Sequence, residues 1–306
     1  MKKKIKLLIT GGTGFIGYHL AKKALAKGWA VTSISTNLPK KKRYIEKVNY
    51  KICDISKKKN LAKNLKEEYT YVVNLAGYVD HSNNKKIYKS HYIGCKNLAD
   101  IILLKKTKSF IQMGSSIEYG KANSPQKENM FCKPVSSYGV SKNLSTKYLL
   151  KLYKKFNFPV TIFRLYQSYG KNQDINRLIP IVINSCLENK NFPCSHGKQR
   201  RDFLYIDDVI KALFIAMKNK KAKGQILNLG SGKPTQVKEL ILSIKRLIGN
   251  GKPLFGKIKM RSEESLKFYP DISKTKKILG WKPSINLKKG LKLVIKSYRS
   301  GGCDKN

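Results

Sequence analysis

A repeated alternation of short apolar runs with helical patterns constrains the fold of this 306-residue chain more than any other feature. The runs have the length and composition of β-strands. Most are apolar at consecutive positions, as in parallel strands that are buried on both faces of a sheet. The expected strands are 5–10, 30–35, 50–53, 71–76, 109–114 and 160–165, and the helices between them lie near 15–27, 58–68, 86–106 and 137–156. Repeated β-α-β units predict an α/β fold with a doubly wound parallel sheet.

The pattern loosens after residue 165. Loops rich in Asn, Gly and Pro surround an expected strand at 226–229 and helices near 176–188, 207–218, 235–248 and 287–299. We therefore expect residues 1–165 to form a Rossmann domain, to which 206–230 returns, and residues 166–306 to form mainly a smaller C-terminal substrate-binding region. Open α/β sheets bind ligands at the carboxyl ends of their strands, so the second part should fold against that edge.

The chain begins with a basic patch and a short apolar run, which imitates a secretory signal. The apolar run stops after Ile9 and meets glycines, so a buried first strand is the better interpretation. No apolar run approaches the roughly 20 residues that span a bilayer. We therefore expect a cytoplasmic protein with no membrane partner. Its six cysteines form no CxxC pair and no metal-ligand spacing, so we expect reduced thiols and no metal.

The formal net charge of +46 raises the question of a nucleic-acid partner. The lysines are scattered over nearly every expected helix and loop, and no RNA-binding signature or zinc-finger spacing accompanies them. Lys, Asn and Ile are all abundant, which indicates compositional drift as in AT-rich genomes. We therefore expect no specific nucleic-acid partner. The charge would still help to attract an anionic small substrate.

A glycine-rich stretch, LLITGGTGFIGYHL, joins the first expected strand to the first expected helix. Glycine at this place permits a tight turn and lets the backbone approach a pyrophosphate, which the positive end of the helix attracts. Strand, loop and helix together predict a dinucleotide site. The candidate cofactor-binding residues of the stretch are Gly11, Thr13, Gly14, Phe15, Ile16 and Gly17.

Tyr138 and Lys142 are four positions apart in SSYGVSK, so on a helix they share one face. A phenol, whose reference pKa is about 10, can exchange protons near neutral pH when a positive charge stabilises the phenolate. In so lysine-rich a chain such a pair arises often by chance, and other motifs have to support it.

With the spacing GxxGxxG in the glycine loop, these residues resemble the extended short-chain dehydrogenase/reductases, a family of nucleotide-sugar epimerases, dehydratases and reductases. Ser115, at the end of the fifth expected strand, matches the Ser or Thr that precedes the family's Tyr-x-x-x-Lys pair. The resemblance covers nearly the whole chain. It implies that Lys142 holds the nicotinamide ribose and Ser115 the reacting sugar oxygen, while Tyr138 passes a proton during hydride transfer.

The same resemblance implies further cofactor contacts. Asp54 matches an acidic residue that touches adenine in the family, with Ile55 beside it. Leu75 and Ala76 occupy the apolar turn that backs the cofactor.

Substrate contacts are implied by motifs further along the chain. Arg201 and Arg261 match positions that grip the substrate diphosphate, where a guanidinium suits paired anionic oxygens. Arg177, in NRLIP, is a further candidate. Gln167 stands where many epimerases carry Asn, and His91 is a second place where Asn is common. The expected partner is therefore a nucleotide sugar, whose base and sugar stay open.

The end of the second expected strand bears on the choice of cofactor. A site that prefers NAD places Asp or Glu there, to bind the ribose 2′-hydroxyl. This chain has Ser35 and Thr36, followed by the basic run 40–43. The missing carboxylate removes repulsion of a 2′-phosphate, and the basic run could attract it. A solvated loop also explains these residues; we nevertheless place NADP ahead of NAD.

The residues after Ser115 narrow the reaction. Family dehydratases carry an acidic pair or Ser-Glu directly after the catalytic Thr, whereas Ser116 and Ile117 follow here. Glu118 comes one place later than the family's acidic residue, and because side chains alternate along an extended chain we expect it to face elsewhere. These departures argue against a 4,6-dehydratase and a decarboxylase, and GSSIEYG resembles 4-ketoreductases. We therefore expect reduction of an NDP-4-keto-6-deoxyhexose at C4. An NDP-sugar 4-epimerase with resident NAD is the alternative, and a catalytically inactive NAD(P)-binding regulatory or RNA-associated protein is the alternative of another class. A homodimer stays open.

Overall fold

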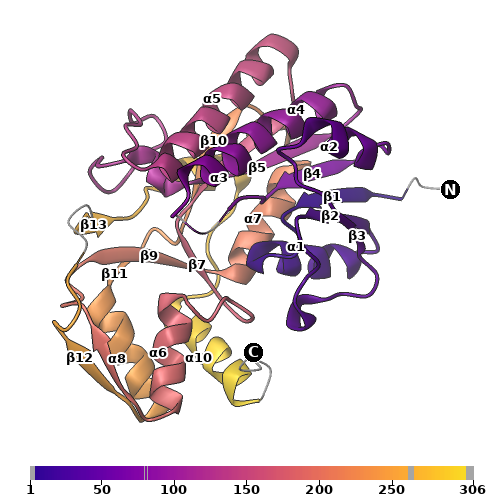
Figure 1. Cartoon of the computed structure of the whole chain (residues 1–306). Helices are drawn as coiled ribbons and strands as arrows, with labels where there is room; N and C mark the ends of the chain where they lie inside the picture. The colour runs from indigo at the N-terminus through magenta and orange to yellow at the C-terminus, as the bar shows by residue number, and fades with distance from the viewer. Residues whose placement is uncertain (1–3, 79, 81, 261–264, 301–306) are drawn as a thin grey trace.

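The computed structural model describes residues 4–78, 80, 82–260 and 265–300, and its largest element is a parallel sheet of seven strands (Figure 1). The strands lie in the order β10-β6-β5-β4-β1-β2-β3. Their bounds are β1 (Lys6–Thr10), β2 (Ala30–Ser35), β3 (Asn49–Ile52), β4 (Tyr71–Asn74), β5 (Ser109–Ser115), β6 (Val160–Leu165) and β10 (Gln225–Leu229). The chain order reverses between β1 and β4, where a ligand crevice opens in folds of this class. The predicted doubly wound parallel sheet is confirmed.

Both faces of this sheet are buried, as β1 illustrates. Leu7 and Ile9 pack in one apolar cluster with α1 (Phe15–Leu25) and α7 (Ile206–Lys218), and Leu8 packs in a second cluster on the other face. The helices of that second face include α2 (Lys58–Asn64), α4 (Gly94–Leu103) and α5 (Ser137–Phe156). Burial on both sides is the reason why the strands are apolar at consecutive positions.

The helix expected near 86–106 has an irregular turn inside it. α3 (Asn84–Tyr88) passes into a π-helical segment, Lys89–Ile93, and then into α4. Such π-helical turns occur frequently at functional positions. This one carries His91.

After β6 the chain also forms a smaller lobe, which lies below the sheet in Figure 1. One small sheet contains β7 (Gln167–Tyr169), β9 (Arg200–Tyr205), β11 (Pro234–Gln236) and β13 (Lys267–Phe268), and another contains β8 (Asn191–Cys194) and β12 (Lys252–Phe255). The remaining helices are α6 (Leu178–Leu187), α8 (Val237–Ile248), α9 (Ser273–Leu279) and α10 (Leu287–Arg299). The sequence pattern missed these six strands and α9. Five of the strands have four residues or fewer and carry little periodicity, whereas β9 is as long as β2 and β6 but begins with Arg-Arg-Asp in place of an apolar run.

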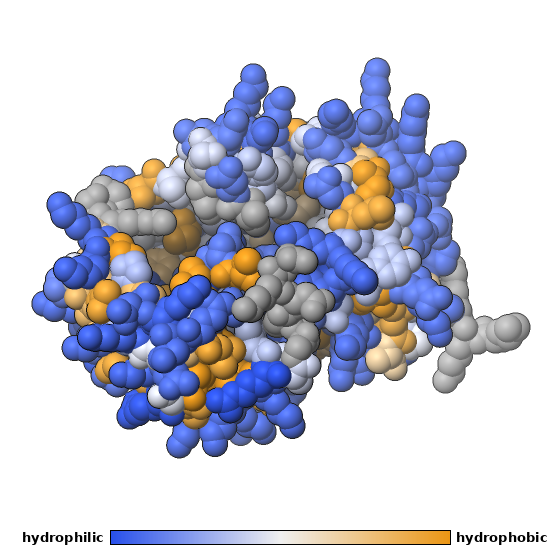
Figure 2. Space-filling view, turned by 60° about the horizontal axis from the view of Figure 1, so that its bottom comes forward, coloured by the Kyte–Doolittle hydropathy of each residue, from blue (hydrophilic) through white to orange (hydrophobic). Residues whose placement is uncertain are grey.

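The surface is largely hydrophilic. Hydrophilic side chains cover most of the face shown in Figure 2, and apolar ones form only scattered patches. Within the described ranges, no helix is long and apolar enough to cross a membrane.

Candidate active site

The glycine loop between β1 and α1 closes tightly against its neighbours. Gly11 has a φ of +73°, and a Cβ there would lie 2.8 Å from the carbonyl carbon of Leu75. A Cβ on Gly17 would lie 2.5 Å from the carbonyl oxygen of Gly11. α1 begins after Gly14 without a side-chain cap, so the first amide groups of the helix can serve a ligand. This cradle fits the pyrophosphate of a dinucleotide.

The other predicted cofactor residues follow the carboxyl ends of β2, β3 and β4. Ser35 accepts a hydrogen bond at Oγ from the backbone N–H of Thr13, at 3.4 Å. The backbone N–H of Leu75 donates to the carbonyl of Thr10, which ties the end of β4 to the glycine loop. Asp54 follows β3 and accepts from the backbone N–H of Ser56, at 2.9 Å. These strands are parallel, so their carboxyl ends share one edge of the sheet.

Two of these candidate cofactor residues, Asp54 and Ile55, also make contacts within the protein. The Asp54 carboxylate stabilises its own turn through the bond just described. The Ile55 side chain is buried against α4, where a Cβ on Gly94 would meet it at 2.5 Å. The side chain of Ile55 therefore belongs to the core, and its role toward a cofactor stays a prediction.

Arg43 belongs to the basic run that we expected to attract a 2′-phosphate, and for this residue the expectation is wrong. It ends a short 3-10 helix, Lys41–Arg43, and is 5% exposed. Its guanidinium donates to the carbonyl of Asn172, at 2.7 Å from Nη2 and 3.1 Å from Nε, and pairs with Asp174 at 2.9 Å. Arg43 thus ties the loop after β7 to the sheet half, and only the lysines of the run stay accessible.

The three predicted catalytic residues come together at the carboxyl end of β5. Ser115 is the last residue of this strand, and Tyr138 lies in the first turn of α5. Lys142 is 5% exposed, and its Nζ donates to the carbonyl of Met113 at 2.7 Å. The same Nζ lies 5.8 Å from the ring centroid of Tyr138. Lys142 therefore connects the end of the strand to the tyrosine.

His91 also contacts these residues. The sequence had singled out His91 only because Asn is common at its position in the family. Its ring packs edge to face on Tyr138, with centroids 4.9 Å apart, and its Nε2 lies 3.0 Å from the carbonyl of Tyr78. A Cβ on Gly77 would lie 1.9 Å from the ring. The glycine after the apolar turn was therefore the sequence signal for a large side chain at this place.

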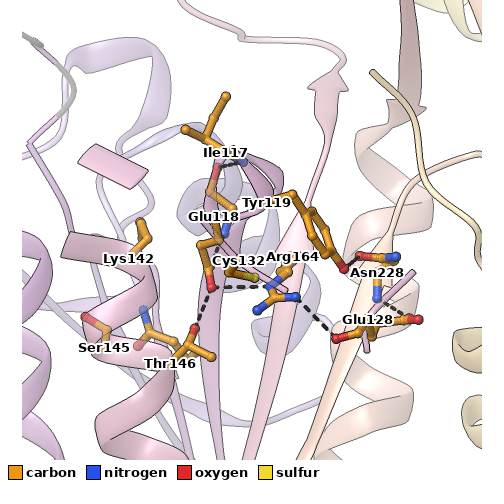
Figure 3. A network of polar contacts seen from close by, with 12 residues as sticks. Ile117, Glu118, Tyr119, Glu128, Cys132, Lys142, Ser145, Thr146, Arg164 and Asn228 are labelled. Atoms are coloured by element: carbon orange, nitrogen blue, oxygen red, sulfur yellow. Dashed lines mark hydrogen bonds and ion pairs between the residues drawn. The ribbon is translucent and has the colours of Figure 1, made fainter. Parts of the chain in front are cut away.

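Glu118, which was expected only to face away from the reacting position, lies in the protein interior (Figure 3). Its side chain is fully buried. Oε1 accepts from the backbone N–H of Ser115 at 2.8 Å, and Oε2 accepts from Thr146 Oγ1 at 2.8 Å and from Arg164 Nε at 3.3 Å. Burial disfavours the charge of Arg164, but Glu118, Tyr119 and Cys132 together outweigh this and raise the pKa of the guanidinium. This buried network was not foreseen.

The predicted substrate residues are less closely gathered. Gln167 begins β7, is exposed, and pairs with Phe203 of β9. Arg201 lies two residues earlier in β9 and is 8% exposed, so both come from neighbouring strands. Arg177 precedes α6 and is exposed. Arg261 lies outside the described residues. In the described part of the chain, no three His, Cys, Asp or Glu residues are grouped to hold a metal ion.

Comparisons with known proteins agree with this geometry. Residues 7–230 match the NAD dependent epimerase/dehydratase family. A Methanocaldococcus jannaschii protein named "Putative UDP-glucose 4-epimerase" is 32% identical over 94% of this chain and 97% of its own. CDP-abequose synthase of Salmonella muenchen is 27% identical over 95% and 97%.

The solved structures that are similar to this chain include two epimerases. UDP-glucose 4-epimerase from Thermotoga maritima, solved with UDP-glucose, has a TM-score of 0.91 at 25% identity, covering 97% of this chain and 99% of its own. UDP-glucuronic acid 4-epimerase from Bacillus cereus, solved with UDP-glucuronic acid and NAD, has a TM-score of 0.88 at 25% identity and the same coverage.

Proposed function

The chain belongs to the NAD dependent epimerase/dehydratase family, and on this premise we propose that it reduces an NDP-4-keto-6-deoxyhexose at C4, with Tyr138 as the proton donor. The observation that carries the proposal is the group of Ser115, Tyr138 and Lys142 at the end of β5, joined through the Lys142 contacts to Met113 and to the tyrosine ring. Such a group suits proton and hydride transfer at a sugar carbonyl.

Each residue has a defined task in this reaction. When bound, NADPH would supply the hydride for C4 of the sugar. Tyr138 would donate its hydroxyl proton to the oxygen on that carbon. Ser115 would hold the same oxygen by a hydrogen bond. The Lys142 ammonium stabilises the phenolate that is left, until solvent returns a proton.

Elimination of water or carbon dioxide would need a further acid or base beside Ser115. The nearest candidate by sequence, Glu118, is occupied with Ser115 N–H, Thr146 and Arg164 in the interior. Ser116 is buried, and Ile117 has no titratable group. A reaction limited to hydride and proton transfer therefore fits these residues best.

A 4-epimerase with resident NAD is the second candidate, because specific observations favour it. The relative from M. jannaschii and the T. maritima structure both carry a UDP-glucose 4-epimerase name. Arg43, which belonged to the run expected to attract a 2′-phosphate, is bound to Asn172 and Asp174 instead. The preference for NADP then rests on the missing carboxylate at Ser35 and on the lysines after it.

The test is an assay of the purified protein with a panel of nucleotide 4-keto-6-deoxysugars and with UDP-glucose. Stoichiometric oxidation of NADPH on a keto sugar supports the reductase. Interconversion of UDP-glucose and UDP-galactose without net oxidation, by protein that retains NAD on purification, supports the epimerase and contradicts our proposal. Tight cofactor binding without turnover on any of these sugars favours the inactive binding protein.

A further inference from the structure

The Glu118 carboxylate joins the two elements that carry the predicted catalytic residues (Figure 3). Through Oε1 it holds the backbone N–H of Ser115, the last residue of β5. Through Oε2 it holds the hydroxyl of Thr146, which belongs to α5. One buried carboxylate therefore connects the strand that ends in Ser115 to the helix whose first turn carries Tyr138.

The attachment on α5 lies on the same side of the helix as the catalytic pair. Thr146 is four residues beyond Lys142 and eight beyond Tyr138, so the three stack along one face. Lys142 crosses to β5 as well, through its bond to Met113. Glu118 and Lys142 are thus two successive connections between this face of α5 and the end of β5.

Arg164 pairs with the Glu118 carboxylate and holds it in place. Its Nε lies 3.3 Å from Oε2, and its side chain is 3% exposed. The guanidinium also lies 4.4 Å from the ring of Tyr119, which in turn donates to Asn228 at 2.7 Å. The Arg164 guanidinium has little freedom to move, because breaking its pair with Glu118 would leave a buried charge without its counter-ion.

The backbone leaves room for this carboxylate at one glycine. A Cβ on Gly114 would lie 2.5 Å from Oε1 of Glu118. In the stretch GSSIE, the glycine leaves space for the carboxylate and the first serine is the predicted site residue. The glutamate side chain folds back onto that serine and forms a capping box with it.

We propose that Glu118 is a positioning residue, which keeps Ser115 in register with Tyr138 and Lys142. The inference rests on the proposed function, because it takes these three as the reacting group. Glu118 itself touches neither substrate nor cofactor in this role. Since a misplacement of about 1 Å can slow an enzyme by about 100-fold, even a small loss of register should be measurable.

The test is Thr146→Val, which removes the helix attachment while keeping the shape of the side chain. We expect kcat to fall about tenfold with KM nearly unchanged, because the substrate contacts of the lobe are untouched. Thr161→Val is the matched control. Thr161 is also fully buried, and its hydroxyl donates to the carbonyl of Ala222 at 2.9 Å, but it lies near the amino end of β6.

If both variants lose similar thermal stability and neither changes kcat, Thr146 is only structural and the proposal fails. Glu118→Gln should lower kcat more than Thr146→Val, because it also leaves the buried Arg164 guanidinium without its carboxylate partner. If Glu118→Gln folds poorly, the comparison of Thr146→Val with Thr161→Val decides the test.

Crystal structures of wild type and both threonine variants give an answer that needs no substrate. We expect the separation of the Ser115 and Tyr138 hydroxyls to change by about 0.5–1 Å in Thr146→Val alone, the scale on which catalytic geometry is sensitive. An unchanged separation overturns the positioning role. A wild type that turns over no nucleotide sugar overturns the proposed function instead, and the structures still decide this inference.

Discussion

The sheet half and the smaller lobe hold their predicted site residues in different ways. In the sheet half, Ser115 and Lys142 are almost fully buried and are tied to the ends of parallel strands. In the lobe, Gln167 and Arg177 are exposed on short elements, and Arg201 alone is buried among the substrate candidates that the structure describes. The difference places the predicted catalytic residues on a rigid frame and the predicted substrate residues on a surface that can vary at little cost to stability.

Tyr138→Phe should give the largest loss of activity. It should change only the reaction step in the sheet half and leave the smaller lobe unaffected. The change removes the proton but keeps the ring that packs on His91. We expect turnover to fall by about 10²–10⁴, the usual contribution of a general acid, with folding and cofactor binding nearly intact. Kinetics, thermal melting and cofactor titration check this. Unchanged turnover ends the catalytic assignment.

Arg43→Met should weaken the link between the two regions. The variant leaves the carbonyl of Asn172 and the carboxylate of Asp174 without their buried donor, so we expect a loss of about 1–3 kcal/mol in the free energy of unfolding. NADPH and NADH dissociation constants should change alike. Lys41→Met, on the exposed side of the same turn, is the control and should leave stability unchanged. A selective loss of NADPH in Arg43→Met would mean that the guanidinium reaches the 2′-phosphate after all.

Ser35→Asp tests the choice of cofactor at the end of β2. A carboxylate there would repel a 2′-phosphate and could accept hydrogen bonds from the ribose hydroxyls of NAD. We expect NADPH binding to weaken by about 1–3 kcal/mol relative to NADH, since the effective dielectric near the surface is high. The measurement is a pair of dissociation constants at two ionic strengths. Salt should shrink the difference if the lysines contribute. A wild type that already prefers NADH favours the epimerase with resident NAD.

His19→Gln should give the smallest effect and concerns the same link as Arg43. The ring of His19, in α1, contacts the carbonyl of Lys171, and burial lowers the pKa of the imidazole below its ordinary 6.5 despite that contact. The folded state therefore resists protonation, and stability present above pH 6.5 is lost as the pH falls below it. The variant should lose less stability than wild type between pH 6.5 and 5. Parallel unfolding curves for the two proteins over this range would contradict the assignment.

The sequence by itself determined the frame of the molecule. The apolar strands of the sheet, the glycine loop and the four-residue spacing of Tyr138 and Lys142 follow from local rules, since each depends on neighbours within a few residues. The expected strand 160–165 and helix 137–156 agree with β6 and α5 to the residue. Family membership followed from the order of these same motifs.

Only the tertiary structure decided which side chains meet across long separations. Glu118 and Arg164 are 46 residues apart, and Arg43 and Asp174 are 131 apart. No local periodicity links such partners. A charged residue gives the same sequence pattern whether it faces solvent or an opposite charge across the fold. The same limit hid the contact of His91 with Tyr138 and the short strands of the lobe, whose pairing depends on partners far along the chain.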